Sequence, residues 1–508
     1  MFCGVTVVLL FVFLLTICVY VKRSFFVRND RINHISGPKP EWVFGNLRKT
    51  GITSGRRLFH EVFADLKQQY GDVFSFWIGP TCGLALSRLE HVQQVLADRQ
   101  TYDQADLTIN SLSLIFPAGL ISLRGNAWKR HARFILPMFR RTKITPYLST
   151  IVDCVDHFID DHFNQNNSKI HTDLVQKSQQ LLLNIIGHIA FDYDLGQASS
   201  TDADLRKALK DLIRSVDVLF ILGALPRWLG KLFLMMYWRF QRTKRIIKHY
   251  VMQIIVEEKN RQENLNLSKK PKSLIASLVA AIHQESSSFT ETSLTPNEVF
   301  DEISMLILAG FETTSTALSW FIFYMTKHPA IQQKIKTELS EHHLTFNNPL
   351  TQETLDSLIY VDCVIKEVLR FAPITAFFAR QATRDDWIDD IPVKRGDHIF
   401  IISPNLHRDQ RYWKVDPSKF VPERFLDQDK TPPHGAYLPF GGGHRACPGQ
   451  ELAIFDLKIA ITRLMQRVTF EDPGKEADNS GGFMQRITCL PKHLAVRVHM
   501  DSVKASIN

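Results

Sequence analysis

The chain lacks the features that mark several common classes of protein. It has no CxxC pair and no internal repeat, and its seven cysteines are scattered along 508 residues. A small disulfide framework is therefore excluded, and a reducing compartment is the simplest environment. No basic run is interleaved with aromatic residues, which argues against a nucleic-acid-binding protein. The apolar residues do not gather into many long spans, so the chain is not a polytopic transporter.

The composition is that of a globular protein, because hydrophobic residues make up 45% and charged residues 22% of the chain. Lysine plus arginine number 61 and aspartate plus glutamate 52, which gives a net charge of +9. An excess this modest and diffuse fits an anionic membrane surface or an acidic protein partner.

The amino-terminal segment is a long apolar run. Residues 2–21 carry no charge, and a helix of that length would span ~30 Å, about one hydrocarbon core. Lys22 and Arg23 follow at once, which predicts a single membrane anchor with the remainder of the chain on the cytosolic side. A cleaved signal peptide is the alternative, but the run is long and no basic residues precede it. Residues 22–45 are basic and rich in proline and predict a stiff linker.

A second apolar segment, residues 219–238, is broken by Gly223, Pro226 and Gly230. These breaks argue against one spanning helix. Two structures fit the pattern: a pair of core helices joined by a tight loop, or a loop that dips into the surface of a bilayer.

The body after the linker is predicted to be mainly α-helical with small β-sheets. Residues 56–71 show a helical pattern, residues 73–79 and 83–87 fit short strands, and residues 125–260 are mainly helical. Residues 258–273 are polar and predict an exposed connection between helices.

The best-defined helix follows Thr295. Thr-Pro-Asn-Glu supplies an N-cap, a proline at the first helical position and a glutamate at the third, which is a capping box. The helical pattern continues to Lys327 and His328, where Pro329 stops it, over a length of ~50 Å. The segment is apolar on most sides, so it should cross the core.

The middle of this helix contains residues that are unfavourable there. Gly310 weakens a helix interior by ~1 kcal/mol relative to alanine. Glu312 and Thr313 place an acid and an alcohol where burial is costly. The cluster suggests a function, although a kinked helix with a backbone-bonded threonine would also explain it.

The strongest feature is the run Phe440–Gly449. Three consecutive glycines let the backbone approach a flat group closely, and Cys447 follows them. Residues 450–466 predict a helix, so Cys447 lies just before a helix N-terminus, where a thiolate is favoured. Arg445 can neutralise a carboxylate on a ligand. A lone cysteine is commonly an inert core residue, and His444 alone does not supply the further ligands that zinc needs.

These motifs together resemble the cytochrome P-450 family. Residues 440, 443, 445, 447 and 449 match its haem-binding run, and residues 309–314 resemble its oxygen-activating helix motif. The motifs occur in the family's order over essentially the whole chain. The apolar anchor and proline hinge resemble membrane-bound eukaryotic members of the microsomal type. Three further marks resemble the family: Trp128, the pair Glu367 and Arg370, and the segment Pro422-Glu423-Arg424-Phe425.

The resemblance implies the family's fold, an α-rich triangular prism with a long central helix, plus one amino-terminal transmembrane helix. It implies a catalytic domain at residues 46–500, between the linker and a tail at residues 501–508. The protein would be a single-pass protein of the endoplasmic reticulum membrane, with its catalytic domain on the cytosolic face.

The resemblance also assigns roles to residues. Cys447 would be the axial iron ligand of haem b (iron protoporphyrin IX), and Thr313 and Glu312 would deliver protons during O₂ reduction, beside space left by Gly310. A buried triad of Glu367, Arg370 and Arg424 would support the cysteine loop, with a surface salt bridge as the alternative. The residues implied to contact the haem are Trp128, Ala309, Gly310, Arg380, Phe440, Gly441, Arg445 and Gly449.

One position departs from the family's pattern. Members commonly place arginine or histidine four residues after the tryptophan, where it meets a haem propionate. This chain has Ala132 there, and Arg130 or Arg133 would have to serve instead.

The implied activity is a monooxygenase that takes electrons from NADPH through a membrane flavoprotein reductase, and a cytochrome b-type donor could assist. The chain has no flavin fingerprint and no iron–sulfur cysteines of its own. His444, Arg445, Lys458 and Arg463 are the candidates to meet the reductase. The substrate would be small and apolar (a lipid, sterol, terpenoid or xenobiotic) and could enter from membrane lipid. The pocket residues implied are Phe116, Leu120, Leu306, Ile374, Phe377 and Met484.

Two other functions stay open. A haem-thiolate isomerase or dehydratase would need no external electrons, but Glu312 and Thr313 would then have no use. A non-catalytic haem sensor would leave the acid–alcohol pair and the apolar pocket unexplained.

Overall fold

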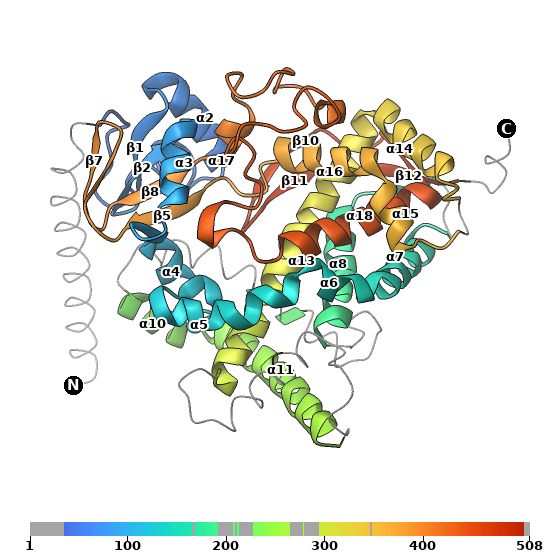
Figure 1. The fold of residues 1–508 in the computed structure, drawn as a ribbon, viewed down its shortest axis with the longest axis horizontal. Helices are drawn as coiled ribbons and strands as arrows, with labels where there is room; N and C mark the ends of the chain where they lie inside the picture. The colour runs from blue at the N-terminus through green and yellow to red at the C-terminus, as the bar shows by residue number, and fades with distance from the viewer. Residues whose placement is uncertain are drawn as a thin grey trace.

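The computed structural model describes residues 35–164, 168–191, 207–208, 211–212, 227–264, 278, 294–345 and 348–501. Helices predominate and the strands form small sheets, as the sequence predicts (Figure 1). The helices are α2 (Phe59–Tyr70), α3 (Leu89–Ala97), α4 (Asp106–Leu112), α5 (Gly125–Ile135), α6 (Arg141–Ile144), α7 (Leu148–His162), α8 (Leu174–Phe191), α10 (Arg227–Met236), α11 (Trp238–Asn264), α13 (Pro296–Lys327), α14 (Pro329–Glu341), α15 (Gln352–Ser357), α16 (Ile359–Phe371), α17 (Ser403–His407) and α18 (Gln450–Arg467).

Four sheets account for the strands. The largest has the order β1-β2-β8-β5-β3 and joins chain segments that are far apart in the sequence. β10 and β11 form a hairpin, β4-β12-β9 form a three-stranded sheet, and β6 pairs with β7. The strands are β1 (Val73–Ile78), β2 (Thr81–Leu86), β3 (Tyr102–Gln104), β4 (Ile170–His171), β5 (Phe378–Ala382), β6 (Asp386–Ile388), β7 (Ile391–Val393), β8 (His398–Ile401), β9 (Val468–Glu471), β10 (Gly481–Gln485), β11 (Cys489–His493) and β12 (Val496–Met500).

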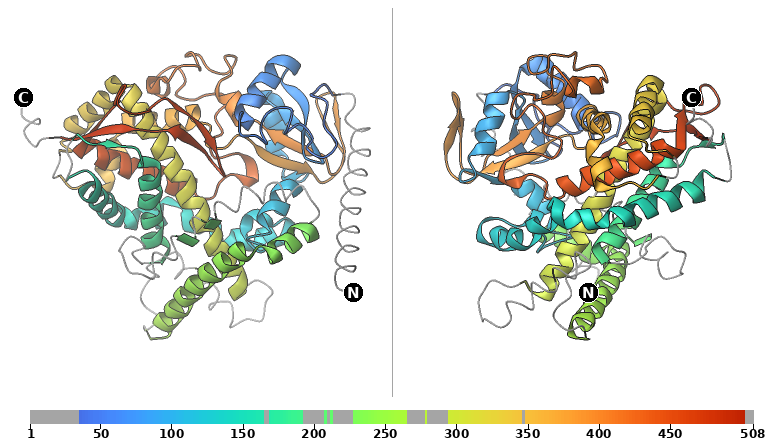
Figure 2. Two further views of the ribbon diagram at one scale, coloured as in Figure 1. Left: turned by 180° about the vertical axis from the view of Figure 1, so that it is seen from behind. Right: turned by 45° about the vertical axis from the view of Figure 1, so that its right-hand side comes forward.

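The sheet of β1, β2, β8 and β5 lies at one side of the molecule with α2 and α3, and the helices α7, α8, α14, α16 and α18 lie at the other (Figures 1 and 2). Helix α13 runs through the helical part, and most of its side chains are buried. The predicted capping box is present, since Thr295 accepts from Glu298 N and Glu298 bonds back to Thr295 N. Placing an apolar helix at the centre lets it bury its surface on all sides.

Among the described residues, α13 is the one helix long and apolar enough to cross a membrane, and 72% of its most apolar window is buried inside the protein. It is therefore a core helix. The predicted anchor at residues 2–21 lies outside the described residues. The described end of the predicted linker is attached to the body, because Asn46 accepts from Trp77 N and its amide donates to Pro38 O.

The prediction of a connection at residues 258–273 is wrong in its first part, because α11 continues to Asn264. Residues 265–273 lie outside the described residues. α10 covers the second half of the broken apolar segment, and α11 follows it. Most large side chains of α10 are exposed, but Leu234 is buried in the main core. Residues 219–226 lie outside the described residues.

Candidate active site

The cysteine loop, residues 440–449, contains the short helical turn Gly443–Arg445 and ends where α18 begins. Cys447 N donates to Phe440 O at 2.9 Å, which closes the loop into a compact turn. Gly441 and Gly443 have φ values of +71° and +69°, which disfavour a side chain. A Cβ on Gly443 would also lie 2.5 Å from Leu96 O of α3, so this glycine lets the loop pass directly over α3.

The thiol of Cys447 is accessible although it lies deep in the protein. Burial raises its pKa, and a hydrogen bond from Gly449 N–H to the sulfur lowers it in part. The side chain is nevertheless exposed, unlike the other described cysteines, which are all buried. Deep surroundings with an open tip are what a sulfur needs if it is to bond to a group held inside the protein.

One face of α13, which we call the open stripe, is also accessible. Ala309 is exposed, and Leu306, Gly310 and Thr313 are partly exposed, although the helix around them is buried. Their spacing of three or four residues places them on one face. An open stripe inside a core helix indicates a hollow beside it.

Two buried cations, Arg445 and Arg380, lie near the cysteine loop. Arg445 Nε donates to Asp103 Oδ1 at 2.7 Å and Nη1 to Leu123 O at 3.0 Å. Its buried Nη2 lies 2.5 Å from the same carboxylate oxygen, so Arg445 is ion-paired with Asp103. The guanidinium lies over the Trp128 ring at 4.3 Å. Although burial raises it, the pKa of Asp103 is held well below its usual range by His444 and Arg445.

Arg380 is a second buried cation. Its guanidinium donates only to carbonyls, Ala379 O at 3.1 Å and Gly442 O at 3.0 Å. No carboxylate lies within ion-pair distance of it in the described part of the chain. Burial, together with the charge of Arg445, lowers its pKa to about 10. A buried guanidinium in this state would gain from an anionic ligand.

The structure shows where the arginines lie that would have to replace the usual propionate contact at Ala132. Ala132 is buried in the main core cluster. Arg130 is turned to α13, where it forms an ion pair with Glu298, and Arg133 is exposed. Arg124 lies close to Arg445 and donates to Gln381 Oε1 at 2.6 Å, a neighbour that sequence reasoning missed.

The side chains of Glu312 and Thr313 on α13 have different surroundings. The Glu312 carboxylate is buried and accepts from Gln179 of α8 at 2.9 Å and from Thr488 at 3.2 Å. It is not in contact with solvent, so the expected proton relay from solvent has no direct start at this atom. Thr313 donates its hydroxyl to Ala309 O at 2.7 Å, which leaves its oxygen free to accept.

Gly310 has a packing reason of its own. A Cβ at this position would lie 3.0 Å from Ile186 Cδ1, so the glycine lets α13 and α8 approach closely. No pattern in the sequence predicts this contact, and the expected space for O₂ beside Gly310 stays a prediction.

The structure brings the three residues of the expected triad together in a buried cluster. Arg370 donates to both Glu367 oxygens at 2.7 Å, and Arg424 lies 3.2 Å from the same carboxylate. All three side chains are fully buried, which excludes a surface salt bridge. Both arginines also donate to Lys419 O, so the triad ties α16 to the chain before the cysteine loop.

The implied pocket residues differ in exposure. Phe116 and Leu120 are buried, whereas Leu306, Ile374, Phe377 and Met484 are partly exposed. Ile374 meets the β10–β11 hairpin, because Cys489 N donates to Ile374 O at 3.0 Å. Phe377 contacts the rings of Phe59, Phe63 and Phe400, so it also belongs to the core under the large sheet.

The predicted partner-facing cations are largely internal. Lys458 is buried and paired with Asp362, and Arg463 is buried and paired with Asp156. Arg445 is committed to Asp103. The prediction that these three meet a reductase is therefore wrong, because their charges neutralise carboxylates within the fold.

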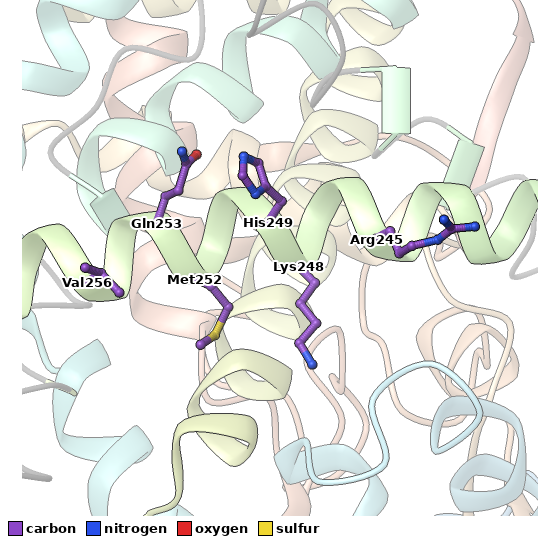
Figure 3. Close-up of a pocket in the computed structure, with 6 residues that line it drawn as sticks. All are labelled: Arg245, Lys248, His249, Met252, Gln253 and Val256. Atoms are coloured by element: carbon purple, nitrogen blue, oxygen red, sulfur yellow. The ribbon is translucent and has the colours of Figure 1, made fainter.

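One hollow lies away from the expected site residues, and another lies behind the cysteine loop. The first follows one helix, and its lining residues Arg245, Lys248, His249, Met252, Gln253 and Val256 all project from α11 (Figure 3). No expected site residue lines it. The second lies behind the cysteine loop, between Lys366 of α16, Phe440 and Gln450 of α18.

The residues present fit a haem. Its iron would find an accessible cysteine sulfur, and its carboxylates would find Arg380, a buried cation that donates only to carbonyls, with Arg445 nearby. The glycines of the cysteine loop leave the backbone free of side chains beside the sulfur.

Comparisons with known proteins agree with this geometry. A sequence model of the family described as "Cytochrome P450" matches residues 35–497. Human cytochrome P450 4V2 is 25% identical over 445 residues, which cover 84% of this chain and 82% of that protein. Cytochrome P450 3A14 of Cavia porcellus is 27% identical over 451 residues, which cover 86% of this chain and 85% of that protein.

Proposed function

Because the chain belongs to the cytochrome P450 family, whose members are haem-thiolate monooxygenases, we propose that it inserts one atom of O₂ into a small apolar organic substrate with electrons from an NADPH-dependent flavoprotein reductase. The observation that supports this most is the accessible Cys447 beside the buried guanidinium of Arg380, which has no carboxylate partner in the described part of the chain. A haem with thiolate ligation, when bound, supplies O₂ activation and O–O cleavage.

The chain's own residues would supply the ligand, the anion sites and the protons. Cys447 would hold the iron, with Gly449 N–H moderating the charge on sulfur. Arg380, Arg445 and Trp128 would hold the propionates. Thr313 would accept and pass a hydrogen bond on the open face of α13, and Glu312 would be held in place by the hydrogen bond from Gln179.

Electron transfer requires a docking face for a reductase. We assign it to exposed cations near the cysteine side, because the buried ones are paired. Arg140, Arg141 and Lys143 are exposed on and before α6, and Arg141 N donates to Glu451 Oε2 in the first turn of α18. Lys366 is exposed beside the hollow behind the loop. An acidic flavoprotein surface, or a cytochrome b-type donor, fits such a face.

A membrane location is supported by α10 and the start of α11. Met235, Met236 and Trp238 are 72%, 77% and 63% exposed, and Leu232 and Phe233 are 41% and 43% exposed. A monomer rarely leaves so many large apolar side chains in water. We propose that this surface rests on the endoplasmic reticulum membrane beside an anchor at residues 2–21, with residues 46–500 as the cytosolic catalytic domain.

The substrate would be apolar, because the proposed pocket walls are Phe116, Leu120, Leu306, Ile374, Phe377 and Met484. Lipids, sterols, terpenoids and xenobiotics share this property.

The test combines purified protein, a microsomal reductase, NADPH and isotopically heavy O₂ with a panel of lipids and sterols. Monooxygenation predicts consumption of NADPH and O₂ together, and a product that contains one heavy oxygen atom. A product that forms without NADPH, or without heavy oxygen, would contradict the proposal and indicate an isomerase or dehydratase.

A further inference from the structure

Acidic residues in the first turns of α13 grip the segment between α4 and α5. We name this segment, residues 113–124, the wall loop, since it contains Phe116 and Leu120. Asp301 Oδ2 accepts from Ala118 N at 2.8 Å, and Asp301 is 6% exposed. A carboxylate that is buried and bonded to one loop amide fixes the position of that loop.

Glu302 acts beside it. Its Oε1 lies 2.6 Å from His131 Nδ1, and both side chains are fully buried. The Leu120 N–H is close enough to lower the pKa of Glu302, although burial raises it overall. The second oxygen, Oε2, has no hydrogen-bond partner among the described residues. Glu302 therefore faces the wall loop and α5 at once.

The packing of the loop depends on this grip. A Cβ on Gly119 would lie 3.2 Å from Met305 Sδ of α13 and 3.1 Å from Phe116 Cβ. The loop thus lies directly on the helix between Ala118, whose amide is bonded to Asp301, and Leu120, whose amide lies close to Glu302. Leu306, the next residue after Met305, belongs to the open stripe of α13, so a shift of the loop would move Phe116 and Leu120 relative to that stripe.

His131 extends the connection to the haem side. It lies three residues after Trp128 on α5, and Trp128 contacts Arg445. The neighbouring Arg130 pairs with Glu298, so three acids at the start of α13 hold α5 and the wall loop together.

We propose that Asp301, Glu302 and His131 are positioning residues that fix the wall loop and thereby set which molecules the pocket admits. The proposal rests on the proposed function, because it takes Phe116 and Leu120 as pocket walls. These contacts explain why Asp301 and Glu302 are buried on α13, whereas Glu298, one turn earlier, is partly exposed.

Amide exchange of the full-length protein tests the tether. Asp301→Ala removes the acceptor, and Asp301→Asn retains a side-chain oxygen at the same place. Exchange at Ala118 should rise about tenfold or more in the alanine variant and stay within about twofold of wild type in the asparagine variant, because the first leaves a donor unpaired. Glu302→Ala and Glu302→Gln give the same comparison at Leu120.

Azole binding tests the effect on the pocket. Imidazole and 4-phenylimidazole are titrated against the haem-loaded variants, and the Soret shift gives the dissociation constants. The ratio of the two constants should change about fivefold or more in Asp301→Ala and less than about twofold in Asp301→Asn. An unchanged ratio together with unchanged exchange in both alanine variants overturns the proposal.

Two further outcomes are separable. If an alanine variant does not fold, the wild-type chain decides: the Ala118 amide should exchange at least about a hundredfold more slowly than the Ile121 amide, and equal rates overturn the proposal. If the wild type gives no azole-dependent Soret shift, the proposed function fails, while the exchange result still reports on the tether.

Discussion

The hydroxyl of Thr313 is the one polar group of α13 that combines partial exposure with a place on the open stripe. Its oxygen keeps acceptor capacity after donating to Ala309 O. Replacing it with alanine should therefore leave binding of an apolar substrate intact and impair proton handling. We expect Thr313→Ala to lower product formed per NADPH severalfold, with the missing electrons recovered as peroxide, which parallel assays measure.

Thr313→Ser is the matched control, because it keeps the hydroxyl. It should retain most of the coupling between NADPH use and product. Unchanged coupling in Thr313→Ala would remove Thr313 from the proton route.

The Glu367 carboxylate lies in an environment where the loss of one partner should lower stability strongly. It accepts from Arg370, Arg424 and Val421 N inside a fully buried cluster. Arg424 also lies 3.3 Å from the buried carboxylate of Asp429, so removing Arg424 leaves that charge uncompensated, which costs about 3–5 kcal/mol. Arg424→Met should therefore lower the free energy of unfolding by that amount and release haem, as urea titration and absorbance at the Soret band measure.

The exposed pair of Arg57 and Asp65 supplies the control for that comparison. Arg57→Met should change the free energy of unfolding by less than about 1 kcal/mol, since exposed ion pairs contribute little. Equal effects of the two substitutions would contradict the view that burial gives the triad its importance.

At the scale of elements, the predicted parts are those whose cause is local. Three predicted helix ends depend only on neighbours in the sequence, and each is present: the capping box at Thr295, the end of α13 before Pro329 and the start of α18 after Gly449. The cysteine loop could be predicted equally well, because its glycines and its cysteine lie close together in the sequence.

What sequence reasoning missed are partners brought together by tertiary folding. Asp103 meets Arg445 across 342 positions, and Thr488 meets Glu312 across 176. Neither contact leaves a pattern in the chain. The predicted surface roles of Lys458 and Arg463 failed for the same reason, since their carboxylate partners lie on α16 and α7.

The start of α13 gives a prediction on pH. Although burial raises it, hydrogen bonds from Arg130 and Thr295 lower the pKa of Glu298 to about 2. A depressed carboxyl pKa stabilises the fold above the unfolded value of 4.5 and loses this contribution as the pH falls towards about 2. The stability difference between wild type and Glu298→Gln should therefore be full at neutral pH and shrink at pH about 3, measured by urea unfolding.

Thr351→Ala, at the start of α15, is the control, because Thr351 caps its helix together with Thr354. It removes an N-cap, at a cost of about 1 kcal/mol, without removing a titrating group or a hydrogen bond to Glu298. Its loss of stability should stay constant over that pH range. A difference for Glu298→Gln that does not fall with pH would contradict the assignment.

At the scale of the whole molecule, the exposed apolar surface of α10 and α11 predicts how the protein sits on a membrane. A fluorescent label on Met236→Cys should show blue-shifted emission when the full chain is bound to vesicles, because the residue enters the apolar boundary. A label on Ser418→Cys, an exposed site elsewhere, should keep the emission seen in water. Identical spectra would contradict the proposed orientation.

The central claim is that the sulfur of Cys447 holds haem iron as a thiolate. The carbon monoxide difference spectrum of the reduced protein tests it most directly, with Cys447→His as the comparison. The account predicts the red-shifted Soret band of thiolate-ligated haem in the wild type and its replacement by the band of imidazole-ligated haem in the variant. The same imidazole-type band in both proteins, or no bound haem in well-folded wild type, would contradict it.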